Sequence, residues 1–594
     1  MKGEHITLPA LQLAAAAFFA TGCQAAAINT GVTDCVDKGN KAIEANKCDG
    51  AGPTGTFFVA QGPLAADEAV NTQLTVQPVN NARKAAGLFG TGGIVRRGFG
   101  KRSPQDEART RELLGITGSW KTVEMRRVAV ESRPNATLLV QSQGLVYTNP
   151  ADSSDPTDNY WPDDRYYSFT SEEIELLKKA GQDVFDMCCE AADYLVDHPE
   201  TITSKMKIPA FALRQIIESW DREPAWGSVY GRFDICFGGL DHPDPRLRVP
   251  KFYEFNADTP TSLVEAASIQ WLWLEQTGCG NDQYNCITEE LITAWKRNLR
   301  HIEEKLGHRP TVHFAVAEGD DTGEDTMNTA LLLDTCQQAG WSTKTLLVED
   351  IGLGPDGRFY DKQNEHIDVI FKLYPWEMMV EQDFAEACFK DMETVGRCNE
   401  DGEYTGGTVW IEAPYKMLWS NKAIFAILWD LFKDDPRSKW LLPTFFDNEA
   451  PASLTKFARK PIFAREGADI VLQADGQVIQ DMKTGVYGKE GYIVQELALL
   501  PSFKDNEDDL HYPVVGLWFV DGDPVGIGVR EDVTPITTNG SAFIPHSISD
   551  GPVSYERQPI PELEEIEASL RMETYHSESA ESKPVLTYIE SVLA

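Results

Sequence analysis

The chain of 594 residues has few basic side chains for its size and no cysteine spacing typical of a metal or redox centre. Lys and Arg number 54 against 92 Asp and Glu, which gives a formal net charge of −38. Binding of nucleic acid depends on clustered basic side chains, so this charge argues against a nucleic-acid partner. None of the eleven cysteines forms a C-x-x-C pair, so a zinc ribbon or a dithiol redox motif has no support. The acidic excess favours solubility and is also compatible with a small cationic substrate.

The apolar run near the N-terminus, from about Ile6 to Ala20, is too short to span a bilayer, because a spanning helix needs roughly 20 apolar residues. The run follows Met1-Lys2 and leads into Ala20-Thr21-Gly22-Cys23, and small residues before a cysteine are typical of a bacterial lipoprotein signal. That cleavage box prefers Leu where Ala20 stands. We therefore predict a signal or anchor-like segment over residues 1–23, with a buried N-terminal helix as the alternative.

Residues 24–104 lack the sustained periodicity of helices and strands and are rich in Ala, Gly, Asn, Thr and Gln. Such a composition buries little apolar surface, so we predict a largely disordered linker or lipoprotein-like segment. The segment contains Gly100-Lys101, which resembles the end of a phosphate-binding P-loop. Val95 occupies the place of the first Gly, however, and Arg102 that of the Ser or Thr. The spacing therefore excludes a P-loop at this position.

Limited proteolysis is expected to cut between about Gln24 and Arg102 and to leave a stable core, because linkers without buried apolar surface are the preferred sites of cleavage. The trimmed protein is expected to melt at nearly the same temperature as the full chain, which a thermal melt of both forms measures. If trimming unfolds the core, the segment is structural and the boundary near residue 104 is wrong.

From about Gln105 to the end, residues 105–594, the composition becomes that of a folded enzyme of α/β (α+β) type. A run of helical spacing stands between two apolar runs with strand character, which makes a β-α-β unit. After Lys460 the pattern becomes rich in strands. The expected helices are Glu172–Val196, Met327–Ala339, Ala423–Phe432 and a segment from Glu562. The expected strands are Thr311–Ala317, Thr343–Val348, Asp368–Leu373, Ala468–Leu472, Gln477–Met482, Tyr492–Leu497, Val514–Val520 and Pro524–Val529.

Asp234, Glu254 and Asn256 are hard oxygen donors of the kind that Mg²⁺ prefers. Glu254 and Asn256 are two residues apart within Phe252–Asn256, so in a strand they lie on the same face. We predict that the three side chains hold Mg²⁺, with a polar strand face as the alternative. Arg232 would share the face of Asp234 and could stabilise charge on a transferring phosphoryl group. Its alternative is an ion pair with Asp234.

Lys422 and Lys460 are candidate phosphate-binding cations. Lys422 comes just before an apolar helix, where the helix dipole disfavours a cation, so it needs a compensating anion. A nucleotide phosphate or a nearby carboxylate would serve. Lys460 precedes Pro461 and is therefore biased to extended geometry. In Arg465-Glu466-Gly467-Ala468 we predict a turn over the phosphates, since Gly467 lets backbone N–H groups approach an anion closely.

Two further polar positions follow apolar strands. Gln495-Glu496 could present amide and carbonyl groups to the edge of an adenine. Arg530 closes the run Val525–Val529 and is a second candidate for binding phosphate. For Arg530 the alternative is pairing with its neighbours Glu531 and Asp532.

Several ordered motifs between about residues 105 and 590 together resemble the glutathionylspermidine synthase family of ATP-grasp ligases, in particular its bacterial acid–amine ligases. They are Tyr230-Gly-Arg-Phe-Asp234, Tyr253-Glu-Phe-Asn-Ala-Asp-Thr-Pro260, Trp271-Leu-Trp273, Ser420-Asn-Lys422, Lys460-Pro-Ile-Phe-Ala-Arg-Glu-Gly467 and Gly526-Ile-Gly-Val-Arg530. Bifunctional members of the family carry an amidase domain with a Cys/His pair. Here His5 is the only histidine before His198, so we expect no amidase.

The resemblance implies an ATP-grasp fold with a pre-ATP-grasp region. It implies Mg²⁺ ligation by Asp234, Glu254 and Asn256, and catalytic roles for Arg232 and Arg530. The residues implied in ATP binding are Arg232, Phe233, Asp234, Lys422, Lys460, Gly467, Gln495 and Arg530. The N-terminal part, with Thr21-Gly-Cys23, resembles a lipoprotein-like family whose gene often neighbours that of the ligase.

The sequence therefore predicts an ADP-forming ligase that uses ATP and Mg²⁺ to join a small acid, such as a peptide carboxylate, to a polyamine-like amine through an acyl-phosphate. One alternative is a non-catalytic, envelope-anchored binding protein on an ATP-grasp scaffold, and another is an amino acid or peptide ligase. Glu324 and Glu377 are candidate carboxylates for the amine, with plain surface positions as their alternative. Because ATP is cytoplasmic, we expect a cytoplasmic catalytic region with a membrane tether at its N-terminus. An exported lipoprotein is the alternative.

Overall fold

A computed structural model describes residues 126–148, 159–221, 228–320, 322–505 and 509–577, together with three short strands further upstream. These strands are β1 (Cys35–Val36), β2 (Ala42–Ile43) and β3 (Gln77–Pro78). The anchor-like segment predicted over residues 1–23, and all other parts of the linker predicted over 24–104, lie outside the described residues. β3 pairs antiparallel with β10 (Gly352–Leu353), so one short stretch of the predicted linker adds a strand to the folded region.

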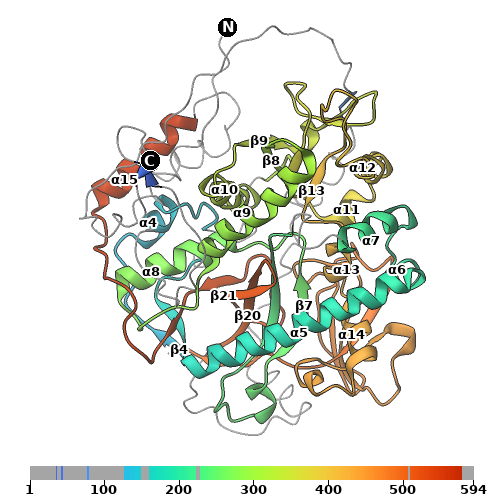
Figure 1. Cartoon of the computed structure of the whole chain (residues 1–594). Coiled ribbons are helices and arrows are strands. Elements are labelled where there is room, and N and C mark those ends of the chain that lie inside the picture. Colours follow the sequence, from blue (N-terminus) through green and yellow to red (C-terminus); the bar gives the residue numbers. More distant parts are fainter. Residues whose placement is uncertain are drawn as a thin grey trace.

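The central sheet is antiparallel and has the strand order β22-β21-β20-β6-β7, with β19 beside β20. The two longest strands, β20 and β21, lie in its middle, and α5 (Ser171–Asp197) packs against β21 (Figure 1). The strands are β6 (Tyr230–Cys236), β7 (Lys251–Asn256), β19 (Phe503–Lys504), β20 (Leu510–Val520), β21 (Asp523–Asp532) and β22 (Ala542–Ile544). Of the predicted site residues, this sheet therefore carries Arg232, Phe233, Asp234, Glu254, Asn256 and Arg530.

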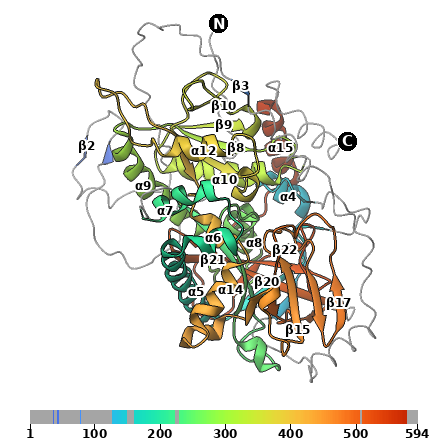
Figure 2. The ribbon, with the colours of Figure 1, turned by 90° about the vertical axis from the view of Figure 1, so that its right-hand side faces the viewer.

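A second antiparallel sheet, in the order β14-β18-β15-β16-β17, carries the lysine and glutamine of the predicted nucleotide site. Figure 2 shows β15 and β17 beside β20 of the central sheet. The strands are β14 (Thr444–Phe446), β15 (Lys456–Pro461), β16 (Val471–Ala474), β17 (Gln477–Asp481) and β18 (Tyr492–Glu496). The strand-rich pattern predicted after Lys460 is confirmed.

A third sheet is wholly parallel, in the order β13-β12-β8-β9. Its strands are β8 (Val312–Val316), β9 (Thr343–Leu347), β12 (Val369–Leu373) and β13 (Val409–Ile411). α10 (Glu324–Gln338) joins β8 to β9 and lies beside α9 (Ile287–Leu306), as Figure 1 shows. The predicted β-α-β unit is therefore correct, and the mixed α/β (α+β) class is confirmed.

The long helix α5 follows the period that the sequence predicted for Glu172–Val196. It begins with a capping box, in which Thr170 accepts from the backbone N–H of Glu173 and the Glu173 side chain accepts from that of Thr170. Its buried stripe includes Ile174, Leu177 and Val184, which belong to the same core as the aromatic back of β6 and β7. Burial of this stripe fixes the helix against the central sheet.

One predicted strand is displaced. Ala468–Leu472 was expected to be extended, but β16 runs from Val471 to Ala474. Residues 466, 467 and 469 have positive φ angles of 54°, 70° and 56°, so this part of the chain turns. The Asp469 carboxylate holds the turn, because it accepts the backbone N–H groups of residues 484, 485, 486 and 487. These hydrogen bonds stabilise the turn, so the strand begins only at Val471.

Further described helices and strands lie outside these three sheets. The helices are α4 (Ala136–Ser142), α6 (Pro199–Ser204), α7 (Leu213–Asp221), α8 (Gln270–Thr277), α11 (Trp376–Met379), α12 (Ala385–Met392), α13 (Lys416–Trp419), α14 (Ile424–Phe432) and α15 (Leu563–Ser577). A π-helical turn, η4 (Glu265–Ile269), precedes α8. The short strands are β4 (Arg126–Ala129), β5 (Arg165–Phe169), β11 (Phe359–Tyr360) and β23 (His546–Ile548).

Cys236, Cys336 and Cys388 are buried and form no disulfide. Among the residues that the structure describes, no helix is both long and apolar enough to cross a membrane.

Candidate functional site

A cavity between the central sheet and the second sheet brings the predicted site residues together. β6 and β7 form one wall, β15 and β18 form the other, and the turns at 464–467 and 535–537 border the cavity. The predicted residues that line it are Asp234, Glu254, Lys422, Lys460, Gly467 and Gln495. A smaller hollow adjoins this cavity, since the two share Glu254, Lys422 and Ala464. Asn256 and Glu377 line that second hollow.

The three predicted metal ligands lie on one face of the pair β6–β7. Asp234 is directly opposite Glu254 in the strand register, and Asn256 is opposite Arg232. The Asn256 amide donates to Asp234 Oδ2 at 3.2 Å and to Glu254 Oε1 at 3.5 Å. Turning this amide over would present its oxygen beside the two carboxylates instead. Two carboxylates and an amide oxygen fit Mg²⁺, which completes its shell with water and substrate phosphates.

This set contains two acidic residues and no histidine. In the described part of the chain, no group of three or more His, Cys, Asp or Glu side chains is placed to hold a metal ion.

Arg232 lies on the same face and is anchored at both ends of its guanidinium. It donates to both oxygens of Asp234, at 2.7 and 3.2 Å, and to the carbonyl oxygen of Thr261 at 2.6 Å. The ion pair that the sequence left as an alternative is therefore present. Gly516 on β20 makes room for this side chain, because a Cβ at Gly516 would lie 2.8 Å from Arg232 Cδ. The arginine is thus preorganised beside the carboxylates.

Lysine side chains bring positive charge close to these carboxylates. Lys422 Nζ lies 2.8 Å from Glu254 Oε2, so a carboxylate supplies the anion that Lys422 was predicted to need. Burial alone would raise the pKa of Glu254, but Lys422, Lys460 and Arg232 together lower it to about 2. The pKa of Asp234 is raised by burial and by Glu254, although Arg232 opposes this. The site thus holds closely spaced charges of both signs, as a site for a metal–phosphate complex requires.

Lys460 is held by the neighbouring strand of its own sheet. Its Nζ donates to Gln495 Oε1 at 2.8 Å and lies 3.4 Å from the carbonyl oxygen of Tyr253. The Gln495 amide also donates to Thr444 Oγ1 at 3.3 Å. Both ends of the Gln495 side chain are therefore engaged inside the sheet, where they orient Lys460. Residues 497–500, which follow β18, line the next part of the cavity border.

ATP affinity is expected to fall as the pH rises from about 7 to about 9.5, by up to about tenfold per unit above the pKa of Lys460. Burial lowers this pKa to about 8, and the nearby Lys422 charge adds to the effect while Glu254 opposes it. Bound phosphate favours the charged amine, so above this pKa binding must take up a proton. Calorimetric titration of ATP across this range measures the slope. Lys460→Arg, which stays charged, should flatten it, and an equal slope in both proteins would contradict the assignment.

The turn that carries Gly467 lies against the loop at 536–537. Gly467 has φ of 70°, and a Cβ there would lie 2.6 Å from the carbonyl oxygen of Thr537. Two residues earlier, Arg465 donates to Glu377 Oε1 at 3.0 Å and to Thr259 Oγ1 at 2.8 Å. The turn thereby bridges the second sheet and the end of β7. Glu377, a predicted amine ligand, is partly buried and engaged with this arginine.

Arg530 shares the cavity-facing side of the central sheet but does not line the cavity itself. Its guanidinium donates to the carbonyl oxygens of residues 538, 539 and 541 and to Ser262 Oγ, each at 3.0 Å. The alternative of pairing with Glu531 and Asp532 is wrong. Period-two alternation turns Glu531 to the other face, where it binds Arg127 at 2.8 Å. Arg530 therefore organises the loop that follows β21.

The two other predicted residues differ in environment. The Phe233 side chain is fully buried on the opposite face of β6 and stacks on Phe255 with ring centroids 3.8 Å apart. Only its backbone belongs to the cavity side. Glu324 is buried at the start of α10, where Asn539 Nδ2 donates to its Oε2 at 3.2 Å. Burial raises the pKa of Glu324, although Arg530 opposes this.

Sequence reasoning missed Gly516 and the loop residues Thr261 and Ser262, and only Gly516 left a trace in the sequence. A glycine inside an apolar strand, as Gly516 is within Val514–Val520, indicates close approach of another group. Ser262 has φ of 66°, and its hydroxyl oxygen accepts a hydrogen bond from Arg530. The carbonyl oxygen of Thr261 accepts one from Arg232. Nothing in their spacing alone distinguishes these residues from an ordinary turn.

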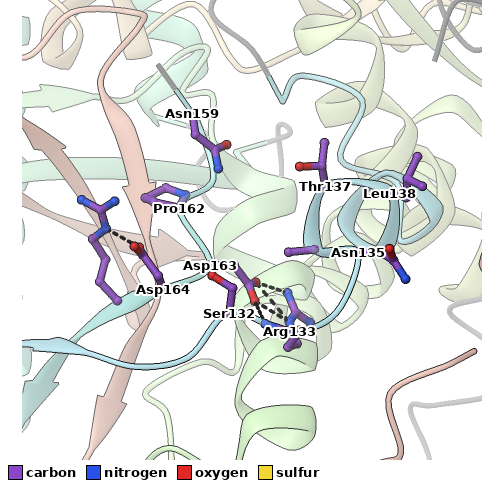
Figure 3. A pocket seen from close by; sticks show the side chains of 11 residues that line it. Ser132, Arg133, Asn135, Thr137, Leu138, Asn159, Pro162, Asp163 and Asp164 are labelled. Atoms are coloured by element: carbon purple, nitrogen blue, oxygen red, sulfur yellow. Dashed lines mark hydrogen bonds and ion pairs between the residues drawn. The ribbon is translucent and has the colours of Figure 1, made fainter. Parts of the chain in front are cut away.

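Another hollow, of about 450 Å³, lies away from this site, between α4 and the start of β5 (Figure 3). Arg133 and Asp163 face each other there and form a buried pair, with Arg133 Nη2 2.6 Å from Asp163 Oδ1. Arg133 also donates to Gln276 Oε1 at 2.6 Å, and Asp163 Oδ1 also accepts from Trp161 Nε1 at 3.1 Å. None of the predicted site residues is among the residues that line this hollow.

Two antiparallel sheets with a cation-lined cavity between them, next to a parallel α/β unit, define a protein of the ATP-grasp type with a pre-ATP-grasp region. The chain belongs to the glutathionylspermidine synthase family, whose pre-ATP-grasp model matches residues 127–549. The family match begins where the described fold begins, at β4.

Proteins from three organisms illustrate the relationship. A Haemophilus influenzae protein named as an acid–amine ligase is 34% identical over 437 residues, which cover 71% of this chain and 99% of that protein. The bifunctional glutathionylspermidine synthetase/amidase of Escherichia coli is 26% identical over 392 residues, or 64% of this chain and 58% of that protein. Trypanothione synthetase of Crithidia fasciculata is 25% identical over 371 residues, or 61% and 53%. The chain thus spans little more than half the length of the latter two. These relatives support a carbon–nitrogen ligase.

Proposed function

We propose that this protein is an ATP- and Mg²⁺-dependent acid–amine ligase that forms ADP, phosphate and an amide. The observation that carries the proposal is the face of β6–β7, where Asp234, Glu254 and Asn256 meet Arg232 on one side and Lys422 on the other. A cluster of oxygen donors beside several fixed cations suits a nucleotide phosphate chain with its metal.

In the proposed reaction a carboxylate oxygen of the acid attacks the γ-phosphorus of ATP, and ADP leaves. The amine nitrogen then attacks the carbonyl carbon of the acyl-phosphate. Phosphate leaves with the oxygen that came from the acid, and the nitrogen loses a proton. Enzymes of this chemistry act mainly by positioning and charge stabilisation.

The residues divide this work between the two walls of the cavity. Lys460 and Lys422 would neutralise the phosphate chain, with Lys460 oriented by Gln495. Arg232, held by Asp234 and Thr261, would face the phosphoryl group as it moves. Mg²⁺, when bound by Asp234, Glu254 and Asn256, supplies charge neutralisation of the phosphate oxygens.

For the substrates we propose a peptide carboxylate and a polyamine-like amine. The synthetase from E. coli is named for glutathionylspermidine, which supports this pairing. The formal charge of −38 also suits a cationic acceptor. The residues before the family match are proposed to be a tether, with a membrane anchor at residues 1–23.

ADP release by the full chain is expected only when ATP, Mg²⁺, an acid and a cationic amine are all present. A coupled assay would screen small peptides against polyamines, and mass spectrometry would identify the amide. The electrostatic part of amine recognition should weaken with salt, because screening at 0.1 M acts over about 10 Å. A matching uncharged amine provides the control.

Each outcome of the screen has a clear meaning. Stimulation by neutral or anionic amino acids alone would replace the polyamine acceptor with an amino acid or peptide ligase activity. ATP binding without turnover for any pair would favour the non-catalytic binding protein.

A further inference from the structure

The loop 257–262, which directly follows β7, contacts each of the three arginines of the site. Arg232 donates to the Thr261 carbonyl at 2.6 Å, Arg530 to Ser262 Oγ at 3.0 Å, and Arg465 to Thr259 Oγ1 at 2.8 Å. The loop begins immediately after Asn256, a proposed metal ligand. The position of this loop therefore determines where the end of the metal-binding strand β7 and the three arginine side chains lie.

A buried ion pair fastens this loop to the parallel sheet. Asp258 Oδ1 accepts from Lys372 Nζ of β12 at 3.1 Å, and Asp258 Oδ2 accepts from the backbone N–H of Trp376 at 2.6 Å. The side chains of Asp258 and Lys372 are 0% and 1% exposed. Lys372 Nζ also lies 4.2 Å from the centre of the Trp376 ring. Trp376 begins α11, whose next residue, Glu377, binds Arg465.

A buried pair of this kind is a weak source of net stability, because desolvation of the two charges offsets much of their attraction. Its geometric effect is specific, since it orients the loop from both carboxylate oxygens at once. We propose that Asp258 and Lys372 are a positioning pair, which aligns the metal and phosphate groups of the cleft with the parallel α/β unit. The proposal rests on the ligase function proposed above.

Kinetics of the Asp258→Asn variant in the full chain test this role. Asn keeps the shape and an acceptor for Trp376 but removes the charge that binds Lys372. We expect kcat to fall about 10–100-fold, as when a partner that orients a metal ligand is lost. The Mg²⁺ concentration for half-maximal ADP release should rise, because Asn256 adjoins Asp258. KM for ATP should stay unchanged, because Lys460 and Gln495 on the other sheet hold the rest of the nucleotide site.

Each single substitution leaves the other residue as a buried charge without its partner, so Asp258→Asn is also combined with Lys372→Met. Two residues that act as one unit lose activity non-additively, so the double variant should be no slower than Asp258→Asn. Asp163→Asn is the matched control, because it breaks the buried Arg133–Asp163 pair away from the site (Figure 3). It is expected to lower the melting temperature without changing the Mg²⁺ dependence.

An active wild-type enzyme whose Asp258→Asn variant keeps both kcat and Mg²⁺ dependence would overturn the positioning role. So would a further loss of kcat in the double variant, or an equal kinetic loss in Asp163→Asn. If the wild type releases no ADP with any acid and amine, the proposed function fails instead. The two failures are therefore distinguishable.

Discussion

Asp234→Asn is expected to raise the Mg²⁺ concentration that ATP binding and ADP release require by about 100-fold or more, because loss of a partner that only orients a metal ligand already costs about 10–100-fold. Asp234 lies between Arg232 and Asn256 and contributes one of the two carboxylates of the proposed site. The substitution removes its charge and preserves its shape. Calorimetric titration of ATP at several Mg²⁺ concentrations, in wild type and variant, measures the change.

Asp430→Asn is the matched control for this experiment. The Asp430 side chain is 81% exposed on α14 and pairs only with Lys433 at the surface. The same chemical change there should leave the Mg²⁺ dependence unaltered. Equal ATP affinity with and without Mg²⁺ in the wild type would refute the metal assignment outright.

Arg232→Lys and Arg530→Ala are each expected to lower kcat by about 10²–10³, the usual cost of losing one preorganised charge contact. Lysine cannot reproduce the planar fork by which Arg232 binds both oxygens of Asp234 and the Thr261 carbonyl. Arg530→Ala also releases the loop at 538–541. The fall in kcat for this variant therefore comes both from the lost charge and from the lost positioning of the loop. Steady-state ADP release and circular dichroism separate turnover from folding.

Arg214→Lys on α7 serves as the control, since Arg214 forms exposed pairs with Glu218 and Glu393. It should keep wild-type turnover. If Arg232→Lys and Arg530→Ala also keep wild-type ADP release while they fold normally, the phosphate role of Arg232 and the positioning role of Arg530 are wrong.

Much of the fold could be predicted because it depends on local periodicity. The helical spacing of Met327–Ala339 between two apolar runs predicted α10 and its β-α-β unit correctly. Glu254 and Asn256 share a face of β7 because alternation along a strand leaves no other choice. The family motifs predicted the ATP-grasp type. Strands recognised one at a time in the sequence could not have predicted it.

The partners of the site residues could not be predicted, since they come from distant parts of the chain. Gln495 was expected to face an adenine, but the register of β15 on β18 turns it toward Lys460. Arg530 finds its acceptors in a loop whose path depends on tertiary packing. The Asp258–Lys372 pair joins residues far apart in sequence, and the motif that contains Asp258 does not indicate Lys372 as its partner. Pairing with Glu531, by contrast, was avoidable, because neighbours on a strand face opposite ways.

Transfer of ¹⁸O from the acid to phosphate tests the proposed ligase reaction most directly. The full chain would be given ATP, Mg²⁺, the amine and an acid labelled with ¹⁸O in its carboxylate, and released phosphate would be analysed by mass spectrometry. An acyl-phosphate route leaves one carboxylate oxygen on each phosphate, so ¹⁸O should enter phosphate in step with amide formation and ADP release. Amide formation with unlabelled phosphate, or with AMP as the nucleotide product, would contradict the proposed reaction.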